Sequence, residues 1–280
     1  MMGKRSFADL LDEHIKSEKT VLPPFNKTAL RVRREVVKEE PDTRVIEELI
    51  SRDQSLASQV LRTANSAFCG GLVKVITVHD AVVRLGVKEV SNIVILVTQR
   101  NHFRSKDPFV NEIMERLWQH SVQCAIGAQW LARYCGFQSL ADQAFIAGLL
   151  HDVGKLFLLM VIEDICSSGK MTSRPSHAMV NEIMNSLHAE QGYFLLKNWN
   201  LPETYCVIAR DHHTEEFDSK DHLLAVIRLV NKACHKMGIG LKTDTDIVLA
   251  ASPEAELLNL SEVSLAELEI TLEDSLALAP

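Results

Sequence analysis

An adjacent histidine and aspartate interrupt a long apolar segment in the stretch Gly148-Leu149-Leu150-His151-Asp152-Val153-Gly154-Lys155-Leu156. The flanking residues 144–150 and 156–162 carry only apolar side chains or glycine. An imidazole and a carboxylate in such surroundings are costly to desolvate unless each has a partner. A divalent metal ion is one partner, because imidazole nitrogen and carboxylate oxygen together suit zinc, iron, manganese or nickel. The alternative is a buried hydrogen bond between the histidine and the aspartate at a helix end. The dipeptide alone does not distinguish the two.

Further histidines favour the metal ion. His120, His188 and the pair His212-His213 lie beside apolar positions on segments with helical patterning. A single histidine in such a place is usually a core residue that donates to a backbone carbonyl. Several buried imidazoles brought together without a ligand would repel one another once protonated, or would stay unsatisfied. The histidines together therefore indicate a metal centre more strongly than any one of them does.

The order of these residues resembles the HD superfamily of metal-dependent phosphohydrolases. Blocks upstream are similar to the front half of HDOD domains, the HD-related output domains of bacterial signalling proteins. These blocks are Leu22-Pro23-Pro24, Asp53 and Leu56, residues 61–68, and residues 80–86, and with the histidine motifs they cover about residues 20–235. The resemblance implies a bacterial, cytoplasmic signalling module with protein partners in signalling.

The resemblance also implies a role for each motif residue. In the two-metal branch of the superfamily, the counterpart of Asp152 bridges two ions. One ion would be held by His120 and His151, and the other by His188, His212 and His213. Lys155 is close enough in sequence to stabilise a phosphate oxygen, so Asp152 and Lys155 are the catalytic candidates. A solvent-facing lysine is the alternative for Lys155.

Two departures from the family pattern limit the expected activity. Asn231 occupies the position of the last metal-binding aspartate of catalytic HD proteins. An amide oxygen is a weak, neutral ligand, so metal affinity should fall and a bound water should be less well oriented. Arg116 stands where the branch that hydrolyses cyclic di-GMP has a glutamate, and residues 214–219 lack the Gly-Tyr-Pro of that branch. Cyclic di-GMP hydrolysis is therefore not implied.

Two functions stay open on this basis. The first is a regulatory HDOD module with a partly degenerate metal site that includes Asn231. The second is a metal-dependent phosphohydrolase that acts on a nucleotide or another phosphoester. The expected cofactor is one or two ions of iron, manganese, nickel or zinc, or none where the site has lost its affinity.

Helical patterning runs through nearly the whole chain and predicts an all-α, multi-helix bundle. We expect a front bundle of residues 1–107, an HD-type bundle of residues 108–237 packed on it, and an acidic helical tail of residues 238–280. Residues 87–98 are rich in β-branched side chains and would suit a strand, but a helix is favoured because no partner strand lies nearby. Helix breaks are expected at Pro23-Pro24 and Gly70-Gly71, and an N-cap at Ser252, while the tail helix could dock on the body or bind a partner.

Composition and charge exclude several other classes of protein. Of the 280 residues, 46% are hydrophobic and 24% charged, as in ordinary globular proteins. The net charge of -7 argues against a protein that coats nucleic acid, and residues 241–280 supply the excess with nine acidic residues and one lysine. The six cysteines include no Cys-x-x-Cys pair and suit reduced core thiols. No apolar run approaches the roughly 18 residues of a membrane span, and residues 1–20 do not resemble a signal peptide.

Overall fold

The computed structural model describes residues 7–17, 26–66, 69, 71, 73–169 and 174–278. The α-helices are α1 (Phe7–Lys16), α2 (Lys27–Val36), α3 (Thr43–Ser51), α4 (Gln54–Ala64), α5 (Val78–Arg100), α6 (Pro108–Tyr134), α7 (Ala141–Leu150), α8 (Val153–Ser167), α9 (His177–Asn198), α10 (Glu203–Asp211), α11 (His222–Lys236), α12 (Pro253–Leu257) and α13 (Glu262–Ser275). Two 3-10 helices, η1 (Leu249–Ala251) and η2 (Leu276–Leu278), complete the described elements. These residues contain no strand, which confirms the predicted all-α fold. The predicted breaks at Pro23-Pro24 and Gly70 lie outside the described residues.

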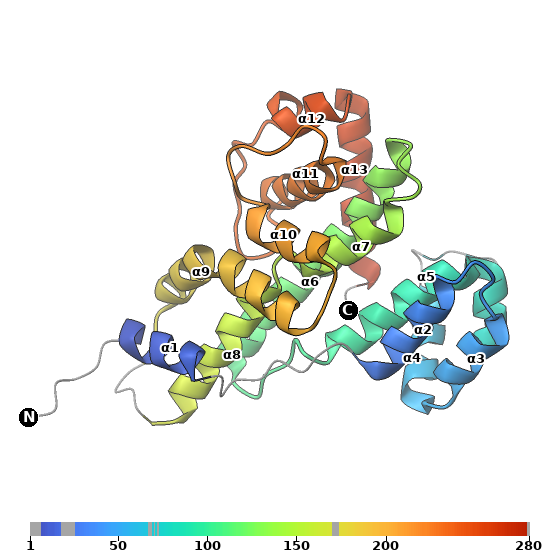
Figure 1. Ribbon diagram of the computed structural model, residues 1–280, viewed down its shortest axis with the longest axis horizontal. Helices are drawn as coiled ribbons and strands as arrows, with labels where there is room; N and C mark the ends of the chain where they lie inside the picture. Colours follow the sequence, from blue (N-terminus) through green and yellow to red (C-terminus); the bar gives the residue numbers. More distant parts are fainter. Residues whose placement is uncertain are drawn as a thin grey trace, which may run out of the picture.

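Helices α2 to α5 form the front bundle, drawn in blue and cyan in Figure 1. Polar side chains inside apolar segments hold its connections in place. The Asn65 amide donates to the Leu61 and Val75 carbonyl oxygens at 2.8 Å each, and accepts from the Val75 N–H at 2.8 Å. Arg84 donates to the carbonyl oxygens of Ala64 and Val73. These bonds fix the segment between α4 and α5.

The β-branched segment is helical, as predicted, and forms the second part of α5. Gly86 separates the two parts with φ of 80° and ψ of 159°, a left-handed conformation that glycine adopts without strain. Residues 90–99 beyond this kink are all buried. Glu89 accepts from Arg133 of α6 at 2.5 Å, and Lys88 pairs with Asp142 of α7 at 3.2 Å. The front bundle therefore packs on the HD-type half through α5.

Two glycines allow close helix packing in the HD-type half. A Cβ atom at Gly148 would lie 2.5 Å from the Cys124 carbonyl oxygen, so α7 lies directly against the backbone of α6. A Cβ atom at Gly154 would lie 2.0 Å from the His188 carbonyl oxygen, so α8 lies against α9. The junction between α7 and α8, which carries His151 and Asp152, is thereby placed between α6 and α9.

The N-terminal helix differs from the predicted grouping of residues 1–107. Helix α1 packs on α8 of the HD-type half, and Figure 1 shows it well apart from α2 to α5. The cause is the apolar face of α1, where Leu10 and Leu11 are buried. The boundaries at residues 107 and 237 stay predictions, since the two halves share one continuous core.

The C-terminal segment docks on the HD-type half. Ser252 caps α12 by accepting from the Ala255 N–H, as predicted. Leu268 and Leu272 of α13 are fully buried, and Gln123 of α6 donates to the Leu272 carbonyl oxygen at 2.8 Å. Of the two alternatives for this tail, the structure therefore shows the docked helix.

One stretch of the described residues, Ala141–Ser167, is long and apolar enough to cross a membrane, and its most apolar window of 18 residues has a mean hydropathy of 1.9. This corrects the expectation that no apolar run approaches that length, because Asp152 and Lys155 interrupt the stretch without ending its apolar character. The stretch consists of α7 and α8, and 89% of its most apolar window is buried inside the structure. Core packing accounts for its hydropathy.

Candidate metal centre

The structure brings the predicted histidines and aspartate to one place, from four different segments. They are His120 of α6, His151 and Asp152 at the α7–α8 junction, His188 of α9, and His212 and His213 after α10. All are buried except His213. Helix packing rather than sequence proximity therefore assembles the cluster.

Asp152 lies at the centre of this cluster, and each of its carboxylate oxygens faces two imidazoles. Its Oδ2 is 3.3 Å from His120 Nε2 and 3.6 Å from His151 Nε2. Its Oδ1 is 3.4 Å from His188 Nε2 and 3.5 Å from His212 Nε2. This is the arrangement of two donor sets that share a carboxylate.

His213 belongs to the second donor set. Its ring and the ligand atoms of Asp152, His188 and His212 lie within 4.8 Å of one another. The first set, formed by His120, His151 and Asp152, meets the same limit. The grouping agrees with the one that the family resemblance implies.

The backbone holds the imidazoles in the form that binds metal. The Nδ1 atoms of His151 and His188 lie 2.8 and 2.7 Å from the carbonyl oxygens of Gly148 and Met184. His212 Nδ1 lies 3.0 Å from the Ala209 carbonyl oxygen. A carbonyl only accepts, so each Nδ1 carries the proton and each Nε2 keeps a lone pair.

The spacing of two Nε2 atoms shows whether the cluster fits a metal ion. His188 Nε2 and His212 Nε2 lie 3.3 Å apart, with two lone pairs facing each other and the Asp152 carboxylate beside them. Asp152 Oδ1 accepts no hydrogen bond from the described residues. Nitrogen and oxygen acceptors that lack a hydrogen-bond donor repel one another at this spacing. A divalent cation between them would relieve the repulsion. The donor set therefore fits a divalent metal ion.

Burial keeps most of these histidines neutral. It lowers the pKa of His151 well below its ordinary value and that of His188 to about 4. It also lowers the pKa of His213 to about 2, with a further contribution from His212. These imidazoles are therefore neutral near pH 7, which is the protonation state that a metal ion needs.

Asp152 and His120 behave differently. Burial raises the pKa of Asp152, but Lys155 and the histidines outweigh burial and hold it well below its ordinary value. Burial also opposes protonation of His120, yet the contacts of its ring with Cys124 and Asp152 outweigh burial and raise its pKa. A metal ion in the first donor set would therefore displace a proton from His120.

Lys155 points into the cluster. It is 7% exposed, and its Nζ lies 2.6 Å from Asp152 Oδ2. The alternative of a solvent-facing lysine is therefore wrong. Lys155 also lines a pocket of about 370 Å³ over the cluster, together with Asn181 and Asn185 of α9. A phosphate group in this pocket would contact the Lys155 ammonium group, and its catalytic role stays a prediction.

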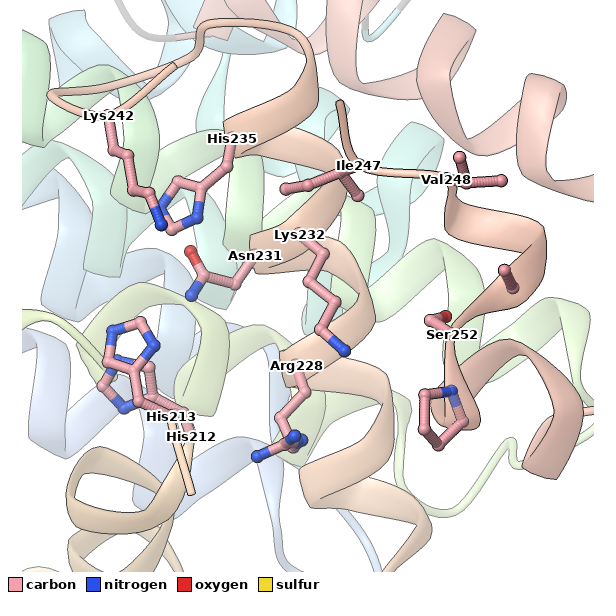
Figure 2. A pocket seen from close by; sticks show the side chains of 12 residues that line it. His212, His213, Arg228, Asn231, Lys232, His235, Lys242, Ile247, Val248 and Ser252 are labelled. Atoms are coloured by element: carbon pink, nitrogen blue, oxygen red, sulfur yellow. The ribbon is translucent and has the colours of Figure 1, made fainter. Parts of the chain in front are cut away.

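Asn231 lies beside the cluster, where the sequence placed it. It is 3% exposed, and its Oδ1 accepts no hydrogen bond from the described residues. It lines a second pocket with His212 and His213, and Figure 2 shows its amide between His213 and His235. The neutral amide thus occupies the place where a carboxylate would add charge to the centre, and its role as a ligand stays a prediction.

Sequence reasoning missed His235. It follows Asn231 by four residues on α11 and so shares its face. Its ring stacks on His120 with centroids 5.8 Å apart and planes at 8°, and it lines both pockets. Burial, then the neighbouring His120, lower the pKa of His235 to about 3. The four-residue spacing from Asn231 was the signal that could have found it.

Two thiols form a layer behind His120. Cys124 Sγ lies 3.6 Å from both His120 Nε2 and Cys234 Sγ. Both cysteines are buried, and burial raises the pKa of Cys124 well above its ordinary value. Neither forms a disulfide, and the other four cysteines are also free, which agrees with the reduced thiols that the sequence predicts.

The sequence matches the HDOD domain over residues 22–215. The chain belongs to the HDOD family. This confirms the resemblance seen in the sequence, and it leaves α11 to α13 of this HDOD chain beyond the matched residues.

Solved structures of low sequence identity share the fold of this HDOD chain. An HDOD domain protein of unknown function from Geobacter sulfurreducens superposes with a TM-score of 0.76 at 22% identity, covering 96% of each chain. A "Putative metal-dependent phosphohydrolase" from Shewanella amazonensis SB2B gives 0.73 at 19% identity, again over 96% of each chain. A "Putative signal transduction protein" from Marinobacter aquaeolei VT8 gives 0.68 at 24% identity, over 97% of this chain and 64% of that one.

A curated relative of this HDOD chain is an uncharacterized protein of Treponema pallidum (strain Nichols). The alignment of 217 residues is 28% identical and covers 74% of this chain and 39% of the relative. The chain therefore spans well under half the length of that protein.

Proposed function

We propose that this chain is a regulatory HDOD module whose His/Asp cluster holds a divalent metal ion and binds a phosphoester, with weak turnover or none. The observation that carries the proposal is Asp152, whose two oxygens face two pairs of histidine Nε2 atoms at 3.3 to 3.6 Å. The name of the Marinobacter aquaeolei relative, which refers to signal transduction, supports a signalling context. Signalling proteins are accordingly the proposed partners.

Charge argues for weak metal binding. Once metal is bound, the cluster offers only neutral imidazoles and one carboxylate, Asp152, so two divalent ions would bring four positive charges to one negative charge. Lys155 adds a further positive charge at 2.6 Å from the same carboxylate. An aspartate in place of Asn231 would offset part of this excess, and the amide does not. We therefore expect the first ion to bind more tightly than the second.

A working phosphohydrolase is the second candidate, and the placement of Lys155 favours it. Its ammonium group lies at the base of the 370 Å³ pocket beside Asp152, where it would bind a phosphate oxygen. A bound metal ion would supply Lewis acidity and lower the pKa of a coordinated water. The name of the Shewanella amazonensis relative also refers to metal-dependent phosphoester hydrolysis.

Metal content and phosphoesterase activity of the purified protein separate the two candidates. Two equivalents of tightly held iron or manganese, with hydrolysis of bis(p-nitrophenyl) phosphate, would favour the enzyme. One weakly held ion with binding of a phosphoester but no hydrolysis would favour the regulatory module. A Lys155→Met variant is the check on any activity, because loss of the rate with unchanged metal content would place Lys155 at the substrate rather than in the fold.

A further inference from the structure

A second pocket lies between α11 and the C-terminal segment, next to the metal centre (Figure 2). Its volume is about 430 Å³, enough for an organic group of small-molecule size. One wall is a single face of α11, made by Arg228, Asn231, Lys232 and His235. The opposite wall is mostly apolar and consists of Ile247, Val248, Ala251 and Pro253.

The polar wall carries an excess of positive charge. Arg228 Nε and Lys232 Nζ lie 2.7 and 2.5 Å from the two carboxylate oxygens of Glu254, which is fully buried. One carboxylate therefore orients two cations and neutralises one of them. Lys242 adds a third cation, whose nearest acidic partner is Asp244 at 3.9 Å. No acidic residue is among those that line the pocket, so an anionic group is favoured there.

Asn231, on the same face of α11, is a buried polar residue of this wall whose side-chain oxygen is unpaired in the described part of the chain. Its side chain is 97% buried, yet its Oδ1 has no hydrogen-bond partner among the described residues. Buried polar atoms are rarely left in this state. In Figure 2 the amide lies at the border between His213, on the side of the metal centre, and the cationic wall.

The two pockets adjoin each other. His213, His235 and Lys242 line both of them. A phosphate group placed over Asp152 in the first pocket can therefore extend an organic group into the second one. Lys242 lines both pockets, so its ammonium group can contact an anionic group that the ligand carries into the second pocket.

We infer that the phosphoester of the proposed function carries a second anionic group, which occupies the pocket of Figure 2 against Lys242 and Lys232 while its organic part packs on Ile247 and Val248. The inference rests on the proposed function for the first phosphate only. The C-terminal segment beyond the HDOD match forms the apolar wall, so it selects the ligand as well as stabilising the fold.

Two isosteric probes test the inference, 4-carboxyphenyl phosphate and 4-carbamoylphenyl phosphate. They differ only in the charge of the group opposite the phosphate, which is too far across the ring to reach the same metal ion. Calorimetry gives the dissociation constant of each probe for metal-free and for Mn²⁺-loaded protein. We expect the carboxylate to bind about five- to tenfold more tightly in both states, as for a charge-assisted hydrogen bond.

Lys242→Gln should bring the affinity ratio of the two probes close to one. Lys242 suits this test because its side chain is 58% exposed, so the variant should fold. Lys220→Gln, on an exposed lysine outside both pockets, should keep the ratio.

Equal affinities in the wild type, no binding of either probe, or a ratio that Lys242→Gln leaves intact would overturn the inference. Failure of the proposed function would give a different result from failure of this inference. In that case Mn²⁺ tightens neither probe, while the ratio measured on metal-free protein still tests the second pocket.

Discussion

Asn231 is the residue at which the sequence predicts that this centre departs from a catalytic HD site. Replacing its amide by a carboxylate changes charge at nearly constant size. Asn231→Asp should therefore raise the affinity for Mn²⁺ roughly tenfold, since changes of this kind around a metal site alter affinity about 10- to 100-fold. Titration of metal-free wild-type and variant protein with Mn²⁺ measures the change. Equal affinities would show that Asn231 does not contact the metal.

His151 provides the control for that variant. It is 1% exposed and belongs to the first donor set with His120 and Asp152. His151→Ala in the Asn231→Asp background should remove the gain in affinity, and any gain in phosphoesterase rate with it. A gain that survives would place the added metal elsewhere on the protein.

At the scale of elements, the contact between α8 and α9 fixes the distance from Asp152 to His188. Gly154→Ala would put a Cβ atom 2.0 Å from the His188 carbonyl oxygen, so the helices must separate. We expect a loss of about 3 kcal/mol in the free energy of unfolding and weaker Mn²⁺ binding. Gly192→Ala is the matched control, because its Cβ would meet nothing closer than 3.5 Å. Similar losses for both variants in urea denaturation would contradict this account.

The contact between α12 and α11 depends on Glu254. Burial raises the pKa of this carboxyl group, but Lys232 and Arg228 outweigh burial and lower it below 4.5. The unfolded chain then binds a proton more readily than the folded protein. The stability from Glu254 is therefore complete above pH 4.5 and is lost as the pH falls through the folded pKa.

Glu254→Gln should cost about 3 kcal/mol of unfolding free energy at pH 7, because it leaves the buried Arg228 without its counter-charge. The difference from the wild type should shrink as the pH falls below 4.5. Urea denaturation at several pH values measures both effects. Glu256→Gln, an exposed acid on the same short helix, should change little at any pH. A difference that does not depend on pH would mean that Glu254 acts through packing alone.

Sequence patterning was a good guide to helices because apolar spacing and caps act locally. It settled residues 87–98 as a helix, and it found Ser252 as the cap of α12. The partner of each helix depends on which apolar faces meet over long sequence distances. For that reason the sequence could not show that α1 packs on α8, or that α12 and α13 dock beside α11 and α6.

The same distinction holds for the centre. The motif gave Asp152 and the five histidines because the HD family keeps them in one order. His235 and Lys242 were missed, since they contribute only through the face of α11 and the loop after it. Whether Lys155 faced solvent or Asp152 was also open in the sequence, because it depends on the burial of the α7–α8 junction.

For the molecule as a whole, bound metal should stabilise the fold, because the cluster joins α6, α9, α10 and the α7–α8 junction. The most direct test is the unfolding free energy of metal-free protein with and without added Mn²⁺, for the wild type and Asp152→Asn. At a Mn²⁺ concentration of about 100 times the dissociation constant, the wild type should gain about 2.7 kcal/mol, and Asp152→Asn should gain nothing. An unfolding free energy of the wild type that is the same with and without millimolar Mn²⁺ would contradict the account.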